Sequence, residues 1–477
     1  MNELAENFAG DKARDIFAPS NRRSFLVRST HGMLGSIVGA GILDSNLLAQ
    51  VPGERPFPVE DVLVANPKAR VPIGMIIDDS TCLVNVNHFA VPQFAEAWGG
   101  GQNYTHDWKS WPREIPDAFV RRFMDWCAEQ GVRGKYSIVP YPACVGRLDR
   151  VLPGWSYKEL RESLKLVREV VTPGWDIHPE MVTHTRVIDL KTGHPYNDHS
   201  LRFMENWEWT TGKSADEIGA YIAYALQILK NVDLPCEGIT TPGGFGNRAL
   251  PQLAQASFQA LRDVYQSEIP HYFRHLYDRG SLSVVPRVEY AKGIKSDQPS
   301  CVVSIIACTG DWTGGWDNTP PEGPDRYITP DLKTGRMVEV IERGEPAFML
   351  SHWTGFYFNG QEIGFKVFQE VVKRLKARFS NLIWMKTSEL ARYWAARELT
   401  QISRRQNQIV LYAPYECSAF TLKIAHRPTF LRVANERKPL TQCANVLQLD
   451  EGRWFEQSGR YLVCFKLPKG ESTIECA

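Results

Sequence analysis

The sequence predicts an α/β fold, a distorted (β/α) barrel of about seven strands followed by a small C-terminal β-sandwich. From residue 71 to about residue 400, short apolar runs alternate with amphipathic helical patterns. This alternation is typical of parallel strands joined by right-handed crossovers, and seven such units suit a closed or nearly closed barrel. A doubly wound open sheet is the alternative, but no G-x-G-x-x-G motif follows a strand.

The individual elements follow from the same periodicities. We expect strands at residues 73–77, 134–139, 175–178, 237–241, 301–307, 347–352 and 382–385. Helical patterns lie near residues 115–130, 157–171, 215–231, 247–264, 332–343, 361–377 and 387–397. After residue 400 the apolar runs are short, β-rich and separated by turn residues, which indicates an antiparallel sandwich over residues 401–477.

Composition excludes several classes of protein. The chain has 477 residues with 43% hydrophobic and 23% charged residues, so it can bury a large core and disorder is not expected. Its 55 Lys and Arg residues balance 54 Asp and Glu residues, which gives no general electrostatic reason to expect nucleic acid as a partner. No uninterrupted apolar stretch reaches about 18 residues, so no stable membrane insertion is predicted.

Ten cysteines are present, and none forms a C-x-x-C pair. This spacing disfavours a zinc knuckle or a thioredoxin-type redox site. We interpret the cysteines as buried free thiols, because cysteine is among the most buried residue types. A disulfide remains open among the last four, Cys417, Cys443, Cys464 and Cys476.

The N-terminal segment is typical of a twin-arginine export signal. The pair Arg22-Arg23 precedes Phe25 and a glycine-rich apolar run, and Ala49 offers a small residue for cleavage. The alternative is an amphipathic helix with a chance arginine pair. We therefore expect recognition by the twin-arginine translocon and a periplasmic or extracellular protein. The predicted organisation is a signal at 1–49, a linker at 50–70, the barrel at 71–400 and the β-rich domain at 401–477.

Two adjacent carboxylates, Asp78 and Asp79, follow the first predicted strand. In a parallel barrel the C-terminal ends of the strands carry the catalytic groups. One carboxylate can bind a metal while its neighbour acts as a base. The alternative is a solvated turn, because aspartate also favours strand ends and caps.

A second group of polar residues follows the third predicted strand. His178, Glu180 and His184 lie within seven residues of one another. Imidazole nitrogens and carboxylate oxygens are the usual ligands of catalytic zinc, which takes three protein ligands and leaves a position for water. Together with Asp79, these residues predict a metal site. His194 and His199 follow in a polar loop, where we expect them to face solvent.

Three further strand ends carry candidate binding or catalytic residues. Pro242, Gly244 and Arg248 follow the fourth strand, where glycine permits close approach of a ligand to the backbone. Asp311, Trp312 and Trp316 form a pairing that is common in sugar-binding sites, although an aromatic loop anchor is the alternative. His352, next to Trp353, ends another strand and can serve as a general acid.

Taken in order, these segments resemble the polysaccharide deacetylase family, which shares the chitooligosaccharide-deacetylase homology domain. The resemblance implies a distorted (β/α) barrel that removes acetyl groups from sugars with a divalent metal. The family's first motif matches Asp78 and Asp79, which implies that Asp78 is the base and Asp79 a metal ligand. Its second motif matches His184 but places Ile188 at the second histidine. His178 is then the nearest substitute ligand, with Glu180 or His199 as others.

The remaining motifs of the family are matched in part. The third, Arg-x-Pro-x-Gly, is matched at Pro242 and Gly244, but its arginine falls at Thr240, so Arg248 is the candidate to compensate. The fourth is echoed by Asp311-Trp312. The fifth, Leu-x-His, is matched at residues 350–352 and implies that His352 is the acid. By this resemblance Trp312, Trp316 and Trp353 would line the sugar subsites.

The sequence thus favours a metal-dependent hydrolase, with zinc as the expected cation, that removes acetyl groups from a carbohydrate. One alternative is a glycoside hydrolase in which Asp78 or Asp79 pairs with Glu180 or Asp311 at a separation of about 5–9.5 Å. A second alternative is a non-catalytic carbohydrate-binding protein on a degenerate barrel. Stoichiometric metal would separate the first hypothesis from the other two.

Overall fold

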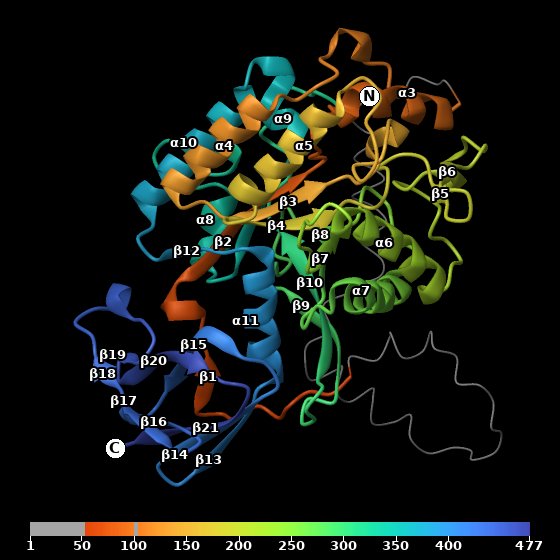
Figure 1. Cartoon of the computed structure of the whole chain (residues 1–477). Coiled ribbons are helices and arrows are strands. Elements are labelled where there is room, and N and C mark those ends of the chain that lie inside the picture. The colour runs from red at the N-terminus through yellow and green to blue at the C-terminus, as the bar shows by residue number, and fades with distance from the viewer. Residues whose placement is uncertain (1–52, 100–103) are drawn as a thin grey trace, which may run out of the picture. The chain divides into compact units, whose positions relative to one another are not determined.

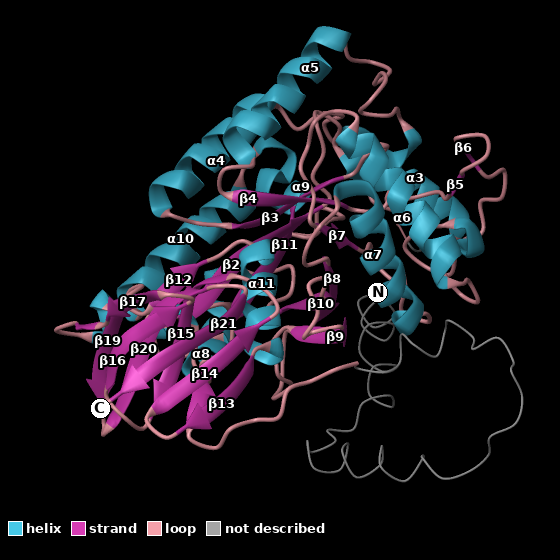
Figure 2. Ribbon diagram, turned by 60° about the horizontal axis from the view of Figure 1, so that its bottom comes forward, coloured by secondary structure: helices cyan, strands magenta, loops and turns pink. Residues whose placement is uncertain are grey.

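The structure is a computed structural model that describes residues 53–99 and 104–477 (Figure 1). The predicted signal segment, residues 1–49, lies outside the described residues. The described residues belong to one compact unit. It is a mixed α/β structure, with helices packed around parallel strands, two further sheets that are mainly antiparallel, and a two-stranded sheet (Figures 1 and 2).

Two sheets contain the parallel strands. One has the order β11-β2-β3-β4, with β12 paired to the start of β2, and the other has the order β7-β8-β10-β9. Only β9 runs antiparallel to its neighbour. The strands are β2 (Val71–Asp78), β3 (Gly134–Ile138), β4 (Trp175–Pro179), β7 (Gly238–Thr240), β8 (His271–Leu276), β9 (Arg287–Lys292), β10 (Ser300–Ala307), β11 (Ala347–His352) and β12 (Leu382–Trp384).

The backbones of the two sheets are joined by one link on either side. A parallel bridge between Glu180 and Thr240 links β4 to β7. The amide of Cys308 donates to the carbonyl of Phe348 at 2.7 Å and links β10 to β11. The described strands therefore form an interrupted ring and not the continuous closed sheet of a regular barrel. At β7 the reason is local, because this strand has three residues and Pro242 beyond it has no amide hydrogen.

The helices lie close to their expected positions. Capping boxes at Ser156–Glu159 and Ser214–Glu217 fix the start of two of them. Strands β8 and β9 and helix α3 were not expected, since polar residues interrupt the apolar pattern of β8. The helices are α3 (Val86–Ala97), α4 (Asp117–Gln130), α5 (Tyr157–Leu166), α6 (Ala215–Lys230), α7 (Leu250–Tyr265), α8 (Arg336–Glu342), α9 (Trp353–Tyr357), α10 (Ile363–Arg378) and α11 (Thr387–Leu399).

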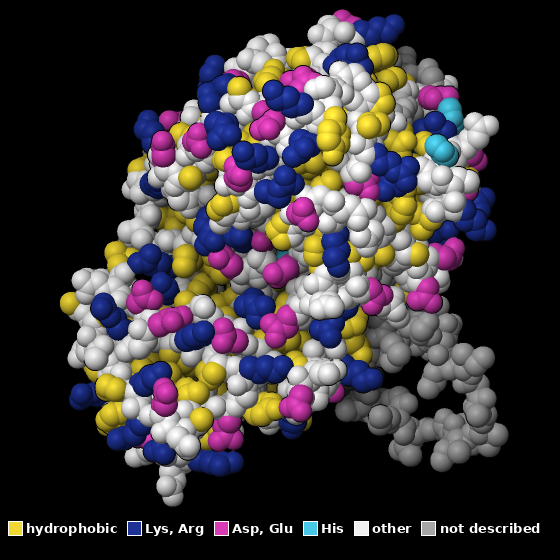
Figure 3. Space-filling view, viewed as in Figure 1, with side chains coloured by type: hydrophobic (Ala, Val, Ile, Leu, Met, Phe, Trp, Pro, Cys, Tyr) yellow, Lys and Arg dark blue, Asp and Glu magenta, His cyan; other side chains and the backbone are white. Residues whose placement is uncertain are grey.

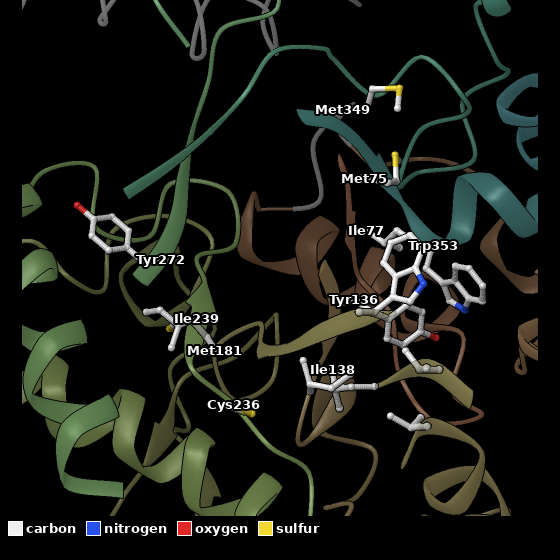
Figure 4. Close-up of a cluster of buried hydrophobic side chains, with 14 of the residues drawn as sticks. Met75, Ile77, Tyr136, Ile138, Met181, Cys236, Ile239, Tyr272, Met349 and Trp353 are labelled. Carbon is white, nitrogen blue, oxygen red and sulfur yellow. The ribbon is translucent and has the colours of Figure 1, made fainter. Parts of the chain in front are cut away.

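Alternation along each strand divides its residues between two cores. Met75, Ile77 and Tyr136 belong to the core cluster beneath the helices (Figure 4). Ile76 belongs instead to a second cluster, together with Phe348 of β11. Because successive side chains of a strand point to opposite faces, the residues in phase with Ile76 face the interior of the ring. This phase carries the polar side chains of the candidate site.

The C-terminal region consists of two five-stranded sheets, ordered β1-β15-β20-β19-β18 and β13-β14-β21-β16-β17 (Figure 2). Residues 50–70, expected as a linker, contribute β1, which pairs antiparallel with β15. The strands are β1 (Val62–Val64), β13 (Gln401–Arg405), β14 (Gln408–Ala413), β15 (Cys417–Ile424), β16 (Pro428–Val433), β17 (Glu436–Pro439), β18 (Thr441–Gln442), β19 (Arg453–Gln457), β20 (Arg460–Leu467) and β21 (Gly470–Cys476).

Helix α11 packs the sandwich against the strands of the ring. Trp394 of α11 lies in one core cluster with Ile305 of β10 and with Phe420 and Val463 of the sandwich. The hydroxyl of Tyr393 donates to the carbonyl of Ala65 at 2.7 Å and accepts from the amide of Thr421 at 3.2 Å. The helix therefore shares both apolar burial and hydrogen bonds with the β-rich region.

Tyr393→Phe is expected to lower the free energy of unfolding by about 1–3 kcal/mol, because the buried amide of Thr421 and the carbonyl of Ala65 would both lose this partner. Urea denaturation followed by fluorescence measures the change. Tyr412→Phe is the control, since its hydroxyl makes only a 3.3 Å bond to the exposed Lys295 carbonyl. Equal stability of the two variants would contradict the prediction.

All ten cysteines are free, and eight of them are buried, which confirms the interpretation as buried thiols. No disulfide forms among the last four. Burial raises the pKa of Cys301 and of Cys417 to about 12, so these thiols remain protonated. Protonated buried thiols are poor nucleophiles and poor metal ligands.

The face shown in Figure 3 carries interspersed basic and acidic side chains, with no large area of one sign. Among residues 53–99 and 104–477, no helix combines the length and the apolar character that a membrane crossing needs.

Candidate metal centre

Asp79, Glu180 and His184 bring three possible ligand atoms within 4.8 Å of one another, and all three residues are buried. Nε2 of His184 lies 2.6 Å from a carboxylate oxygen of Asp79 and 3.5 Å from one of Glu180. Neither carboxylate oxygen of Asp79 has a hydrogen-bond partner of acceptable geometry among the described residues. Buried lone pairs that converge in this way fit a divalent cation.

This group of three side chains carries more negative than positive charge. Although burial lowers it, Asp79 and Glu180 raise the pKa of His184 well above its ordinary value. Burial raises the pKa of Asp79, but His184 and His352 outweigh it and lower that pKa below its ordinary value. Two carboxylates around one imidazole therefore leave excess negative charge, which a divalent cation would neutralise.

The backbone that presents these ligands is strained. Asp79, Met181 and His184 have φ values of 58°, 50° and 63°, in the left-handed region that such residues rarely adopt. A carboxylate oxygen of Glu180 accepts the amide of Asp79 at 2.7 Å and holds the first of these turns. Strain of this kind persists where surrounding contacts fix it, and it is common at functional sites.

Glu205 holds the second turn and was missed by the sequence analysis. Its carboxylate accepts the amides of Thr183 at 3.0 Å and His184 at 2.6 Å, and also the hydroxyl of Tyr221 at 2.5 Å. Burial raises the pKa of Glu205 to about 7. No motif surrounds Glu205 in the sequence, so only the fold reveals that it positions His184.

Asp78 lies beside this group and faces a buried lysine. The ammonium of Lys135 forms an ion pair with the carboxylate of Asp78 and donates to the hydroxyl of Ser137 at 2.7 Å. Burial and the charge of Glu180 raise the pKa of Asp78 to about 6, while Lys135 and His352 lower it. The cation that contacts Asp78 is thus Lys135, whereas Arg248 pairs with Glu208. The sequence signal was the single charged residue within strand β3.

His352 lies directly opposite Asp78, because these two residues are paired in the register of β11 and β2. Its Nδ1 lies 2.7 Å from a carboxylate oxygen of Asp311, and its amide donates to the other oxygen at 3.1 Å. Burial lowers the pKa of His352, but Asp311 and Asp79 outweigh it and raise that pKa to about 10. The structure thus brings together Asp78, Asp79, His184, Asp311 and His352.

Trp353 and Trp312 belong to the core and do not line an open subsite. Trp353 is 1% exposed and packs against Phe119, Phe123 and Tyr136 (Figure 4). Trp312 is 4% exposed and packs against Tyr327. Each follows a polar residue of the candidate site, and its indole is buried in the core cluster on the helix side of the strands. The expectation that they stack on sugar is therefore corrected.

Trp316 does lie near the centre. Its ring is 5.5 Å from that of Phe94 and 5.6 Å from that of Tyr104, and the Phe94 ring is 6.4 Å from His184. Trp207 packs on the other side of Phe94 at 5.1 Å. Trp316, Trp207 and Tyr104 are each only partly buried, so they form an aromatic border beside the ligand group.

The loop after β7 serves a packing role. The backbone of Gly244 approaches the carbonyl of Asn206 so closely that a Cβ on Gly244 would lie 2.8 Å from that oxygen. The absence of a side chain at Gly244 therefore allows a neighbouring loop to approach the backbone. The sequence analysis had expected a ligand to approach at this position. Pro242 is buried in the same turn. Arg248 is exposed and pairs with Glu208 at 3.6 Å, so it does not replace the missing arginine.

His178 is not a ligand of this centre. It belongs to a separate group with Asp176 and His271, whose possible ligand atoms also lie within 4.8 Å of one another. Burial lowers the pKa of His178 well below its ordinary value and also lowers that of His271. His199 pairs instead with Glu96 near the surface. Of the three alternatives for the remaining ligand, Glu180 is the one that lies in a group with Asp79 and His184.

No protein-family model matches the chain, and no curated protein matches it by sequence. Among solved structures, the chain is similar to Puue allantoinase, with 10% identity, a TM-score of 0.33 and coverage of 58% of this chain and 72% of that one. It is also similar to an α-L-fucosidase, with 12% identity, a TM-score of 0.28 and coverage of 86% and 97%. An endo-β1,6-glucanase gives 9% identity, a TM-score of 0.26 and coverage of 87% and 93%.

The described residues thus define a mixed α/β protein in which two candidate metal-binding groups lie inside an interrupted ring of parallel strands. The function proposed below rests on the geometry of these side chains.

Proposed function

We propose that the protein is a metal-dependent hydrolase of the polysaccharide deacetylase type, which removes acetyl groups from a carbohydrate. The observation that carries this proposal is the meeting of a buried ligand group with a carboxylate and an imidazolium at the same strand ends. Asp79, Glu180 and His184 would hold the cation, while Asp78 and His352 lie opposite each other beside it. An acid and a base that lie close to a Lewis acid suit acyl hydrolysis.

When bound, a divalent cation supplies Lewis acidity at the acetyl carbonyl and lowers the pKa of water. The set of two carboxylates and one imidazole is richer in oxygen than a His-His-Asp set. It therefore suits a harder cation such as Mn²⁺ as well as the expected Zn²⁺.

Asp78 is the base in this proposal. With a pKa of about 6, its carboxylate is ionised at neutral pH and basic enough to take a proton from the attacking water. Lys135 holds the carboxylate in place through its ion pair and favours the ionised form. The base is therefore ready before substrate binds.

His352 is the acid. Asp311 accepts from Nδ1, which leaves Nε2 to give its proton to the departing oxygen or nitrogen of the sugar. Its raised pKa keeps the imidazole protonated at neutral pH. Trp316, Trp207 and Tyr104 would present ring faces to the sugar beside this acid.

The test is acetate release from acetylated oligosaccharides by protein loaded with Zn²⁺ or Mn²⁺. We expect the wild-type protein to release acetate. The His184→Ala variant should lose the cation, and its rate should fall at least about 10³-fold, because the cation is the main Lewis acid. His194→Ala is the control, since His194 is exposed on β6 (His194–Pro195). Cleavage of glycosidic bonds without acetate release would favour a glycoside hydrolase, and sugar binding without turnover would favour a binding protein.

Lys135→Met is expected to shift the ascending limb of the pH profile of kcat/KM to higher pH. Lys135 lowers the pKa of Asp78, so its removal raises that pKa and a higher pH is needed to ionise the base. Initial rates between pH 5 and 9 measure the shift, with circular dichroism to show that the variant is folded. An unchanged limb would exclude Lys135 from setting the ionisation of the base.

The export signal remains a proposal from the sequence. Because of the Arg22-Arg23 motif, we propose that the twin-arginine translocon exports the chain. The exported protein would meet carbohydrate outside the cytoplasm. Fractionation of cells that express wild-type protein and Arg22→Lys/Arg23→Lys protein tests this, and export of both proteins would contradict it.

A further inference from the structure

We propose that Asp176, His178 and His271 form a second site for a divalent cation of the zinc class, with a structural role inside the ring of strands. This site is separate from the ligand group around His184, and its existence does not depend on the proposed acetyl-removing activity. The three residues come from β4 and β8, which flank β7 (Figure 1).

The two histidines meet across a glycine. His271 is paired in register with Gly238 of β7, and His178 reaches the same point from β4 on the other side. A Cβ on Gly238 would lie 2.4 Å from Nε2 of each histidine. Any other residue at position 238 would therefore displace the imidazoles. The middle strand leaves the space in which the two rings come together.

The facing nitrogens are arranged as ligands. Nε2 of His178 and Nε2 of His271 are 3.0 Å apart. Two imidazoles that share one zinc ion at about 2.0–2.1 Å, in tetrahedral geometry, have nitrogens about 3.3 Å apart. The observed separation is close to that value, and both side chains are fully buried. Little movement would be needed to admit a cation.

The outer ring nitrogens have partners of their own. Nδ1 of His271 lies 3.4 Å from the carbonyl of Ile269, which can only accept a proton. This contact places the proton on Nδ1 and leaves a lone pair on Nε2. Nδ1 of His178 lies 3.4 Å from the hydroxyl of Thr240. Metal-binding histidines commonly have such a partner on the second nitrogen, because it fixes the tautomer and the ring orientation.

Asp176 supplies the third ligand. It lies two residues before His178 on β4, so both side chains point to the same face of the strand. Its carboxylate accepts the hydroxyl of Thr387 at 2.8 Å, the amide of Ser388 at 2.6 Å and the hydroxyl of Ser388 at 2.8 Å. These bonds hold the carboxylate rigidly. Two of them end on Oδ2, whereas Oδ1 accepts only the hydroxyl of Ser388 and keeps a lone pair for a cation.

The position of these three residues supports a structural role for the cation. Asp176 and Thr387 connect β4 to the first turn of α11, while His271 belongs to β8. A cation here would join two sheets of the ring to the helix that packs the sandwich. The backbones of β4 and β7 are otherwise joined by a single bridge, so a cross-link at this position would reinforce their junction.

The test is the metal content of the full chain, purified, stripped with a chelator, reloaded with Zn²⁺ and dialysed. We expect about two zinc ions per wild-type chain and about one in His271→Gln and in His184→Ala, each variant having lost one site. His275→Gln is the matched control on the same strand β8, and it should keep both ions. Anomalous diffraction at the zinc edge on wild-type crystals should place one ion between His178 and His271.

Each of the other outcomes would overturn either the second cation site or the ligand group around His184. A single ion that is lost in His184→Ala and kept in His271→Gln would overturn the second site and leave a simple hydrogen bond between the two histidines. A single ion that is lost in His271→Gln and kept in His184→Ala would support this site and overturn the ligand group of the proposed hydrolase. If His271→Gln does not fold, the anomalous signal of the wild-type protein alone decides, and no signal at His178 and His271 overturns the inference.

Discussion

Asp78→Asn is expected to lower kcat for acetate release about 10²–10⁴-fold, because asparagine cannot take the proton of the attacking water. The amide oxygen can still accept from Lys135, so the side chain should keep its position. Metal content and KM should stay near their wild-type values, since Asp78 is not one of the three ligands. Steady-state kinetics with metal analysis on the same samples gives both numbers.

The control for this variant is Asp117→Asn. Asp117 is a partly buried carboxylate outside the site that accepts the hydroxyl of Ser163 at 2.7 Å. The Asp117→Asn variant should retain wild-type activity. This control distinguishes a general effect of removing a carboxylate from the specific loss of the catalytic base. A fall of less than about tenfold in Asp78→Asn would exclude Asp78 as the general base.

His352→Ala should lose activity according to the leaving group. For an acetylated sugar we expect kcat/KM to fall about 10²–10⁴-fold, because the departing alkoxide or amine needs a proton. For 4-nitrophenyl acetate the loss should be far smaller, since nitrophenolate leaves without protonation. Measuring both substrates on one preparation separates an acid from a residue that only binds substrate.

Asp311→Asn should show the same dependence on the leaving group in a milder form. A carboxylate oxygen of Asp311 lies 2.7 Å from Nδ1 of His352, and its charge raises the pKa of His352. The neutral asparagine would bind the imidazolium less strongly. The descending limb of the pH profile should move to lower pH, because the pKa of His352 falls when this negative charge is removed. Equal losses on both substrates in His352→Ala would contradict the role of acid for His352 and of positioning residue for Asp311.

Local sequence patterns were sufficient to place most of the elements. The apolar run expected at 347–352 is β11, and the helices expected near 215–231 and 387–397 are α6 and α11. Hydrophobic periodicity and capping residues determine such segments within a few neighbours along the chain. Strand β8 was missed because histidine and arginine interrupt its apolar pattern, although it carries His271. Its strand conformation depends on pairing with β7 and β10.

The sequence by itself also indicated which polar residues lie at or beyond the strand ends. Asp78 and His352 end recognisable strands, and Asp79, His184 and Asp311 follow such strands. Parallel strands bring these ends to one side. What the sequence could not determine is which partners these residues meet. His178 and Glu180 share one face of β4 but lie about 6–7 Å apart along it, at roughly 3.3 Å per residue. His178 therefore joins the group of Asp176 and His271, whereas Glu180 joins the ligand group of Asp79 and His184.

Only the tertiary structure decided three further points. It placed Lys135 against Asp78, Glu205 beneath the turn of His184, and Trp353 in the core. Each depends on the register between strands that are distant in the sequence, or on a loop that packs after the sheets have formed. Periodicity predicts the face on which a residue lies, whereas contacts across the ring determine which charge, turn or aromatic ring it meets.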